Sequence, residues 1–367
     1  MEKNLHIVCH EIPWPVKHGG HIDLFYKIES LFHAGVKIHL HCFYKQSSDL
    51  FELKKYCSSI NIYKRRKFSF SFFTPYIVSS RKDKNLFKNL CKDEYPILFE
   101  GIHTTFYLRN LLRSKRKIAV RLHNTEHIYY KNLSENEAGF LKKIYFRFES
   151  FLLKKYEKKL PSDATYFAVS KRDIENFDVK SILFLPVFIA NQKIQSQTGT
   201  GKFCLYHGNL SVNENECAVK WLAEKVFRNN DVKFVVAGLN PSNKLKSYLK
   251  QFSNVELIEN PSGDEMTELI KIAQINLIYS FNTTGVKLKL INSFIYGRFC
   301  VANTNAAEGS GLEEFCRIAN SSTEFKAIIN EFINVEFSEN EILRRKKITE
   351  KIYNNSVNSS TIIKLLF

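Results

Sequence analysis

Short apolar runs rich in β-forming residues alternate with longer amphipathic runs along the whole sequence. The β-rich runs lie at residues 5–9, 37–43, 97–100, 118–122, 166–169, 182–185, 203–207, 233–237, 255–258 and 275–279. Helix-like runs lie between several of them, at about 22–34, 140–159, 214–227, 242–251 and 264–272. This alternation predicts an α/β protein whose parallel sheets are covered by helices.

A polar segment divides this pattern into two halves. At 367 residues the chain is long for a single hydrophobic core and suits two domains. Residues 191–202 lack aromatic side chains and are the best linker. We therefore predict a first Rossmann-like domain over 1–190 and a second over 203–340. A helical tail over 341–367 would follow and could pack back on the first domain.

The net charge of +17 is concentrated in the first half of the chain. Residues 1–200 hold 34 Lys and Arg against 19 Asp and Glu, whereas residues 201–367 hold 20 against 18. A basic half attracts an anionic substrate, an anionic membrane surface or nucleic acid. Charge alone does not choose among these partners.

Composition argues against a membrane-spanning or secreted protein. No apolar run approaches the roughly 18–20 residues that span a bilayer. The N-terminal apolar run is too short and too polar for a signal peptide. The eight cysteines show neither a C-x-x-C pair nor zinc spacing. We expect a cytoplasmic protein with reduced thiols, peripheral at most to the inner face of the cytoplasmic membrane.

The stretch from Tyr279 to Leu312 carries the strongest sign of a ligand site. A β-rich run is followed by a turn over 282–285 with N-cap residue types, and then by an amphipathic helix. Lys287 and Lys289 would lie in the first helical turn, where cations are unfavourable unless an anion is near. Because helix N-termini bind phosphate, this segment predicts a nucleotide site. The alternative is that both lysines extend into solvent.

A second candidate cluster follows the β-rich run at 118–122. His123, Asn124, Glu126 and His127 could form an acid/base or substrate-orienting group. A satisfied polar turn is the alternative. His123 and His127 have i, i+4 spacing, but no third ligand is evident, so we predict no metal site.

Three glycine-containing turns also follow β-rich runs. In His18-Gly19-Gly20 the paired glycines would let the backbone approach a ligand, although a simple strand-to-helix turn explains them equally well. Gly208-Asn209 is a similar turn in the second half. Gly238 ends a buried run and would let a base or ribose lie against the backbone.

In their order and spacing, these motifs resemble those of the retaining glycosyltransferases of family 4, which have the GT-B fold. The resemblance spans most of the chain and also rests on Gly285-x-Lys287-x-Lys289-x-x-Asn292 and on the loop 307–309. It implies two Rossmann-like domains that face a central cleft. The first would bind the acceptor and the second a nucleotide-diphosphate sugar as donor substrate, with no metal and no other cofactor.

The resemblance also assigns roles to residues. Lys287 or Lys289 would neutralise the departing diphosphate in place of a metal ion, and His123 would contact the transferred sugar or handle a proton. His18, Asn124 and Glu126 would contact substrate. Donor binding would involve the turns and the helix after Gly285, namely Gly19, Gly20, Gly208, Asn209, Gly238, Thr284, Gly285 and Asn292.

Two features depart from the family pattern. Thr284 and Asn292 stand where the family has the two Glu of an E-x7-E motif, and an amide accepts ribose hydroxyls more weakly than a carboxylate does. The usual lysine after the turn at 208–210 is missing, since none occurs before Lys220. We expect Lys287 and Lys289 to take its place; impaired activity is the alternative.

The leading hypothesis is a retaining, metal-independent hexosyltransferase that acts on a cell-envelope polysaccharide or a lipid-linked saccharide. One alternative is a degenerate, non-catalytic GT-B protein or a binding protein that uses its basic surface. The other is a nucleotide-sugar 2-epimerase. No nucleic acid partner is expected.

Two further segments combine cations with large apolar side chains. The segment 63–73 would either contact an anionic bilayer or form an amphipathic edge strand with a charged lead-in. The run at 140–159 is predicted to be a helix that packs on the core and keeps a solvated basic face. Its apolar positions are Phe140, Ile144, Phe148, Phe151, Leu152 and Tyr156.

Overall fold

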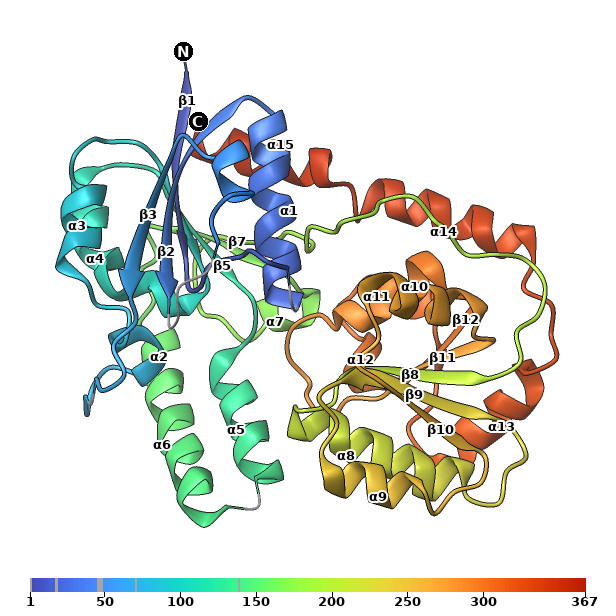
Figure 1. Cartoon of the computed structure of the whole chain (residues 1–367). Helices are drawn as coiled ribbons and strands as arrows, with labels where there is room; N and C mark the ends of the chain where they lie inside the picture. The colour runs from blue at the N-terminus through green and yellow to red at the C-terminus, as the bar shows by residue number, and fades with distance from the viewer. Residues whose placement is uncertain (1, 17–18, 45–48, 70, 138) are drawn as a thin grey trace. The chain divides into compact units, whose positions relative to one another are not determined.

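The computed structural model describes residues 2–16, 19–44, 49–69, 71–137 and 139–367. The chain forms two compact units. Unit 1 comprises Met1–Ala190 together with Tyr353–Phe367, and unit 2 comprises Asn191–Ile352. Each unit is an α/β structure built on one main sheet (Figure 1).

Unit 1 contains a seven-stranded parallel sheet in the order β3-β2-β1-β4-β5-β6-β7. Its strands are β1 (Lys3–Cys9), β2 (Val36–Tyr44), β3 (Ser59–Lys64), β4 (Ile97–Glu100), β5 (Ile118–Leu122), β6 (Thr165–Ala168) and β7 (Ile182–Phe184). Most of these strands were predicted; β3 was not. Because all seven run in the same direction, their carboxyl ends lie together on one side of the sheet, where ligands of such folds bind.

Helices cover both faces of this sheet. They are α1 (Gly19–His33), α2 (Tyr76–Ser79), α3 (Lys84–Leu90), α4 (Leu108–Leu111), α5 (Glu126–Asn136), α6 (Phe140–Glu157), α7 (Lys171–Ile174) and α15 (Asn355–Leu366), with short 3-10 helices η1 (Leu53–Lys55), η2 (Ile102–Tyr107) and η3 (Leu112–Ser114). Successive side chains of a strand point to opposite faces. Accordingly, Leu5 and Ile7 of β1 pack in one core with α1 and α15, and Val8 packs in the other.

Unit 2 contains a six-stranded parallel sheet in the order β10-β9-β8-β11-β12-β13. Its strands are β8 (Cys204–Asn209), β9 (Phe234–Leu239), β10 (Val255–Glu259), β11 (Ile275–Ile278), β12 (Phe299–Ala302) and β13 (Arg317–Ile318). The prediction of two parallel sheets is therefore confirmed.

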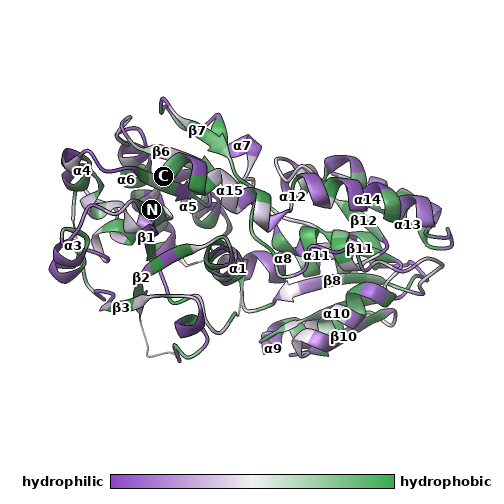
Figure 2. Cartoon of the chain, turned by 90° about the horizontal axis from the view of Figure 1, so that it is seen from above, coloured by the Kyte–Doolittle hydropathy of each residue, from purple (hydrophilic) through white to green (hydrophobic). Residues whose placement is uncertain are grey.

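The helices of unit 2 follow its strands in alternation. They are α8 (Asn213–Trp221), the π-helix η4 (Leu222–Phe227), α9 (Asn243–Leu249), α10 (Gly263–Ile272), α11 (Leu288–Tyr296), α12 (Thr304–Ala307), the 3-10 helix η5 (Glu313–Phe315), α13 (Ser322–Phe332) and α14 (Glu339–Lys351). Helix α11 is largely hydrophobic and buries most of its residues, whereas α14 is largely hydrophilic (Figure 2).

No helix in the described parts of the chain has both the length and the apolar character needed to cross a membrane. The eight cysteines carry free thiols, and five of them are buried.

Helix α6 forms as predicted, but the prediction that it packs on the core is wrong for most of its apolar positions. Phe140, Ile144, Phe148 and Phe151 are 74%, 50%, 38% and 53% exposed, and only the C-terminal part of the helix reaches buried neighbours. Figure 1 shows the reason: α5 and α6 lie side by side and project away from the strands of unit 1.

The segment 63–73 leaves the sheet early. Strand β3 lies at the edge of the sheet and ends at Lys64, so the edge-strand interpretation holds only that far. Beyond it, Phe68, Phe72 and Phe73 are 95%, 67% and 90% exposed, and Phe70 lies outside the described residues.

Gly238 is required by the packing of two strands. A Cβ atom at this position would lie 2.0 Å from the backbone oxygen of Gly208 and 2.8 Å from Cγ of Leu210. Strands β8 and β9 pair at this point, and Gly208 is the partner of Gly238 in the register. This glycine therefore has a structural role that is independent of any ligand.

We expect Gly238→Ala to destabilise the protein by about 1–3 kcal/mol or more, because the backbone must shift to admit the methyl group. Gly263→Ala is the matched control: its Cβ would meet nothing within 4 Å, and it lies in the first turn of α10. Thermal unfolding should show a clear drop in Tm for the first variant and none for the second. Equal melting temperatures for the two variants would contradict this account.

Candidate functional site

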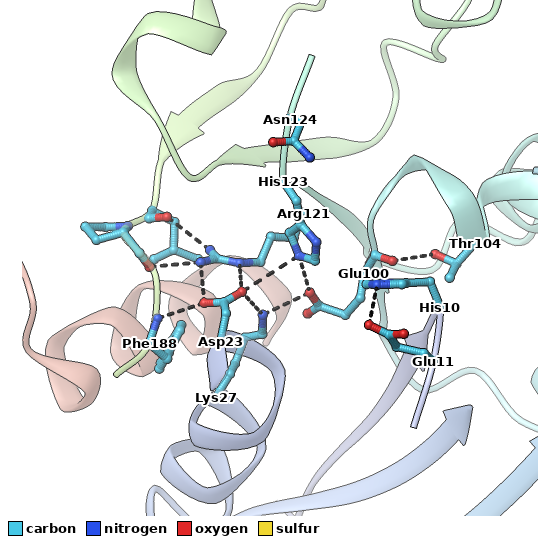
Figure 3. A network of polar contacts seen from close by, with 12 residues as sticks. His10, Glu11, Asp23, Lys27, Glu100, Thr104, Arg121, His123, Asn124 and Phe188 are labelled. Carbon is cyan, nitrogen blue, oxygen red and sulfur yellow. Dashed lines mark hydrogen bonds and ion pairs between the residues drawn. The ribbon is translucent and has the colours of Figure 1, made fainter. Parts of the chain in front are cut away.

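A network of buried charges lies in unit 1 and joins α1, β4 and β5 (Figure 3). Asp23 of α1 accepts two hydrogen bonds from Arg121 of β5, each of 2.9 Å. Lys27, one turn further along α1, donates to Asp23 at 3.1 Å and to Glu100 of β4 at 2.9 Å. Two carboxylates thus balance two cations, and the buried group as a whole is neutral.

The cations keep both carboxylates ionised. Burial raises the pKa of Asp23, but the charges of Arg121 and Lys27 outweigh it and hold this pKa well below its ordinary value. Burial likewise raises the pKa of Glu100. The charge of Lys27 and the hydrogen bond from His123 outweigh burial, so the pKa of Glu100 lies below its ordinary value. Both carboxylates can therefore act as hydrogen-bond acceptors across the whole neutral pH range.

His123 follows β5 and contacts this network at its edge. Its Nε2 lies 3.1 Å from Oε2 of Glu100 and 3.7 Å from Oδ2 of Asp23. An ionised carboxylate can only accept, so Nε2 carries a proton, and in the neutral ring Nδ1 is then the acceptor. The side chain of His123 keeps 16% of its surface exposed. The network thus holds the imidazole in one tautomer and leaves Nδ1 for proton transfer.

Two histidines that the sequence analysis did not single out lie beside His123. His10 follows β1, and His103 follows β4 within η2. The rings of His10 and His103 stack with centroids 5.0 Å apart, and His10 meets His123 edge-on at 5.7 Å. Burial lowers the pKa of both His10 and His103, so they are neutral at neutral pH. Their position after parallel strands was the signal that could have identified them.

The predicted residues of the first turn lie close to the charge network in sequence. Gly19 and Gly20 begin α1, the helix that supplies Asp23 and Lys27. His18 lies outside the described residues, and its role stays a prediction.

Of the other members of the second predicted cluster, His127 has a partner outside the cluster, whereas Asn124 and Glu126 contact each other. His127 pairs with Glu157 of α6, whose other oxygen accepts a hydrogen bond from the backbone N–H of His127 at 3.2 Å. Asn124 donates from Nδ2 to Oε1 of Glu126 at 3.2 Å. The contacts of His127 with Glu157 therefore have a structural role at the start of α5.

Glu126, the first residue of α5, is an unusual carboxyl group because it is only 4% exposed. Burial raises its pKa to about 8, against the effect of the hydrogen bond from Asn124. It is therefore mostly protonated at neutral pH, and in that form it can donate a hydrogen bond as well as accept one.

Asp23, Glu100 and His123 place three potential metal-ligand atoms within 4.8 Å of one another. The carboxylates already form close ion pairs with Lys27 and Arg121. A divalent cation would have to compete with two buried positive charges, which makes these groups poor metal ligands. Their chemistry suits the orientation of His123 better.

In unit 2, Lys289 extends from the first turn of α11 toward β8 and α8. Its Nζ donates to Tyr206 Oη and to Asn215 Oδ1, each at 2.8 Å, and lies 4.4 Å from the centre of the Tyr206 ring. Burial lowers the pKa of Lys289 to about 8. The two hydrogen-bonding partners are neutral groups, and the charge of Glu214 raises the pKa of Lys289 less than burial lowers it.

The turn before α11 is built by hydrogen bonds. Gly285 has φ of 66°, a left-handed conformation that glycine adopts readily. Asn282 Oδ1 accepts from both the backbone N–H and the hydroxyl of Thr284, each at 3.1 Å. Lys287 is the N-cap residue, one position before the helix, and its Nζ donates to the backbone oxygen of Thr284 at 2.7 Å. The structure thus brings both predicted lysines to the start of α11.

The remaining predicted residues of unit 2 lie at the end of a strand and within a helix. Gly208 and Asn209 end β8, and the backbone oxygen of Asn209 accepts from Nδ2 of Asn215 at 2.9 Å. Asn215 thereby connects this turn to Lys289. Asn292 lies on α11 and is half-buried.

We expect Glu126→Gln to gain stability relative to wild type as pH rises. The ordinary pKa of this carboxyl is 4.5 and its folded value is about 8. Wild type therefore loses stability between about pH 4.5 and 8, whereas the amide has no proton to lose. Between pH 5 and 9 the difference in unfolding free energy should move in favour of the variant by at least about 1 kcal/mol, the value of a single pKa unit.

The control is Glu135→Gln, which removes an exposed carboxylate of the same helix. Its difference from wild type should be the same at both pH values. A pH-independent difference for Glu126→Gln would contradict the assignment.

Comparison with known proteins places this geometry in context. No family model matches the chain. The chain is similar in sequence to a Klebsiella pneumoniae protein called an uncharacterized 44.6 kDa protein in the cps region. The two are 28% identical over 358 residues, which cover 90% of this chain and 91% of the relative.

Several solved structures are similar in fold to this chain. TarM has a TM-score of 0.68 with 12% identity, over 100% of this chain and 99% of that one. A glycosyltransferase from Rickettsia africae has a TM-score of 0.66 with 11% identity, over 100% and 98%. HepE from Anabaena, solved in complex with UDP and glucose, has a TM-score of 0.62 with 9% identity, over 98% of each chain. This likeness confirms the predicted GT-B fold.

Proposed function

We propose that this protein is a glycosyltransferase that moves a sugar from a nucleotide-diphosphate donor to a saccharide acceptor. The observation that carries the proposal is the pair of lysines at the start of α11 in a GT-B fold. Two proteins with this fold support it: one is a glycosyltransferase from Rickettsia africae, and the other, HepE, was solved in complex with UDP and glucose.

The donor is assigned to unit 2. A diphosphate there would meet the positive end of the α11 dipole and the ammonium groups of Lys287 and Lys289. These fixed charges would stabilise the negative charge that develops on the leaving nucleotide, which is the task a metal ion performs elsewhere. We therefore propose transfer without a metal, and with retention of configuration as in glycosyltransferase family 4.

The departures from the family-4 pattern are compatible with activity. Lys289 lies 2.8 Å from Asn215, and Asn215 is hydrogen-bonded to the turn that ends β8. A cation is thus present beside the turn after which the family lysine is missing. Asn292 is half-buried on α11 and is proposed to accept a ribose hydroxyl, more weakly than a carboxylate would.

The acceptor is assigned to unit 1. His123, held by Glu100, is proposed to contact the reacting sugar or to handle a proton through Nδ1. Asn124 and the protonated carboxyl of Glu126 would bind acceptor hydroxyls. We propose a cell-envelope polysaccharide or lipid-linked saccharide as the acceptor, at the cytoplasmic face of the membrane.

The first test is a thermal-shift screen against UDP, GDP, CDP and dTDP and their sugars, with and without a chelator. A ligand at about 100 times its Kd should add roughly 2.7 kcal/mol of stability. We expect one nucleotide to raise Tm regardless of chelator, and Lys287→Ala and Lys289→Ala to abolish the rise. Lys244→Ala, an exposed lysine of α9, is the control and should keep it.

Other results of this screen would redirect the assignment. No shift with any nucleotide would favour the degenerate or binding-only alternative. A shift followed by interconversion of the sugar without transfer would favour a 2-epimerase. Loss of the shift on adding chelator would contradict the proposed replacement of a metal by lysines.

Nucleotide affinity should also fall as pH rises from 7 to 9. Lys289 has a pKa of about 8 and loses its charge over this interval, whereas the terminal phosphate, with a second pKa near 6, is already fully ionised. Calorimetric titration at both pH values measures the difference. Lys289→Gln should bind weakly at both and lose the pH dependence. A wild-type affinity that is constant from pH 7 to 9 would contradict a role for the charge of Lys289.

A further inference from the structure

The outward face of α6 is apolar over most of its length. Exposed fractions are highest near the start of the helix, at 74% for Phe140 and 81% for Leu141, and Ile144, Tyr145 and Phe151 remain 41–53% exposed. Figure 1 shows that this end of α6 forms the tip of the projecting α5–α6 pair. Large apolar groups gathered on one protruding tip mark an interaction surface rather than scattered exposure.

The solvent-exposed charges of α6 are all positive. Its two carboxylates are buried: Glu149 accepts from the backbone N–H of Ile77 at 3.0 Å, and Glu157 pairs with His127. Its five cations remain at the surface, four of them exposed, and they are Lys142, Lys143, Arg147, Lys154 and Lys155. The solvent-facing side of α6 is therefore basic and apolar together.

A second segment extends this surface. Side chains from this segment line a cavity of about 200 Å³ together with α6, and they are Lys67, Phe68, Ser69, Ser71 and Tyr76. Its aromatic and aliphatic lining includes Phe68, Tyr145, Phe148 and Leu152, and Lys67 lies at the same cavity. The exposed rings of Phe72 and Phe73 continue the apolar character along the segment. Two elements that are distant in sequence thus form one surface, which we call the α6 face.

We propose that the α6 face docks on the surface of an anionic lipid bilayer. The partner is identified by its chemistry: phosphate headgroups would meet the cations of α6 while Phe and Leu side chains enter the acyl boundary. Each Lys or Arg near an anionic membrane surface contributes about 1 kcal/mol. A protein partner would have to combine an apolar centre with a dense anionic rim, whereas an anionic bilayer presents both everywhere.

Docking through the α6 face explains why this helix is apolar where it has no core to cover. It also assigns the segment 63–73 a role shared with α6 rather than one of its own. The inference rests on the proposed function only in naming the acceptor as membrane-linked. Vesicle binding is measured separately from nucleotide binding, so the failure of one does not entail the failure of the other.

The test is co-sedimentation with vesicles of phosphatidylglycerol and phosphatidylcholine, compared with phosphatidylcholine alone. We expect wild type to bind the anionic vesicles at least tenfold more tightly. The triple variant Phe140→Ser, Leu141→Ser, Ile144→Ser should lose at least tenfold in this affinity. The matched control, Ile272→Ser, Val335→Ser, Leu343→Ser, changes side chains of 40–46% exposure in unit 2 and should bind as wild type does.

A second arm locates the surface directly. Phe140→Trp should show additional fluorescence that shifts to the blue with anionic vesicles and is quenched by brominated acyl chains. Lys142→Gln with Arg147→Gln should weaken binding and reduce its dependence on salt. An unchanged Tm shows that each variant is folded.

Three results would overturn the proposal. The first is equal binding of wild type to neutral and anionic vesicles, or no binding to either. The second is an equal loss in the control variant. The third is a change of oligomeric state in the triple variant, measured by light scattering, without any vesicle binding by wild type, which would assign the α6 face to contact with a second copy of the chain.

Discussion

The ion pair between Asp23 and Arg121 is the contact on which the site of unit 1 depends. The Asp23 carboxylate also accepts from the backbone N–H of Phe188 at 2.7 Å, so one side chain joins α1, β5 and the segment after β7. Lys27 extends the network to Glu100, and Glu100 orients His123. Removing one member of a buried pair leaves a charge without a partner, at a cost of about 3–5 kcal/mol. The same network of buried ion pairs therefore stabilises unit 1 and orients His123.

Two buried cations, Lys27 in unit 1 and Lys289 in unit 2, have different kinds of partner. In unit 1, Lys27 forms ion pairs with two carboxylates, which compensate its charge. In unit 2, Lys289 is held by a hydroxyl and an amide oxygen, and burial brings its pKa down to about 8. A cation that is desolvated but not neutralised gains most from an incoming anion. This property of Lys289 supports the proposal that the nucleotide binds at the start of α11.

Sequence patterns predicted elements well where a local rule was sufficient. Buried parallel strands appear in the sequence as short apolar runs, so the bounds of β4 and β5 were predicted to the residue. The turn before α11 was also predicted, but the N-cap of that helix is Lys287 and not one of the N-cap residue types at 282–284. The same patterns failed for α6. A period of 3.6 residues shows that one face of a helix is apolar, but it does not show what covers that face. The apolar face of α6 is exposed because the helix projects beyond the sheet.

The sequence by itself determined two parallel sheets and the presence of lysines at a helix start, because both follow from residues that are neighbours along the chain. Only the tertiary structure decided which groups meet. Asp23, Glu100 and Arg121 come from separate elements, and their pairing depends on strand order and helix packing. Tertiary packing likewise pairs His127 with Glu157 and buries Glu126, whose pKa of about 8 keeps it mostly protonated at neutral pH. Long-range contacts and burial set the charge states, and neither is encoded in local spacing.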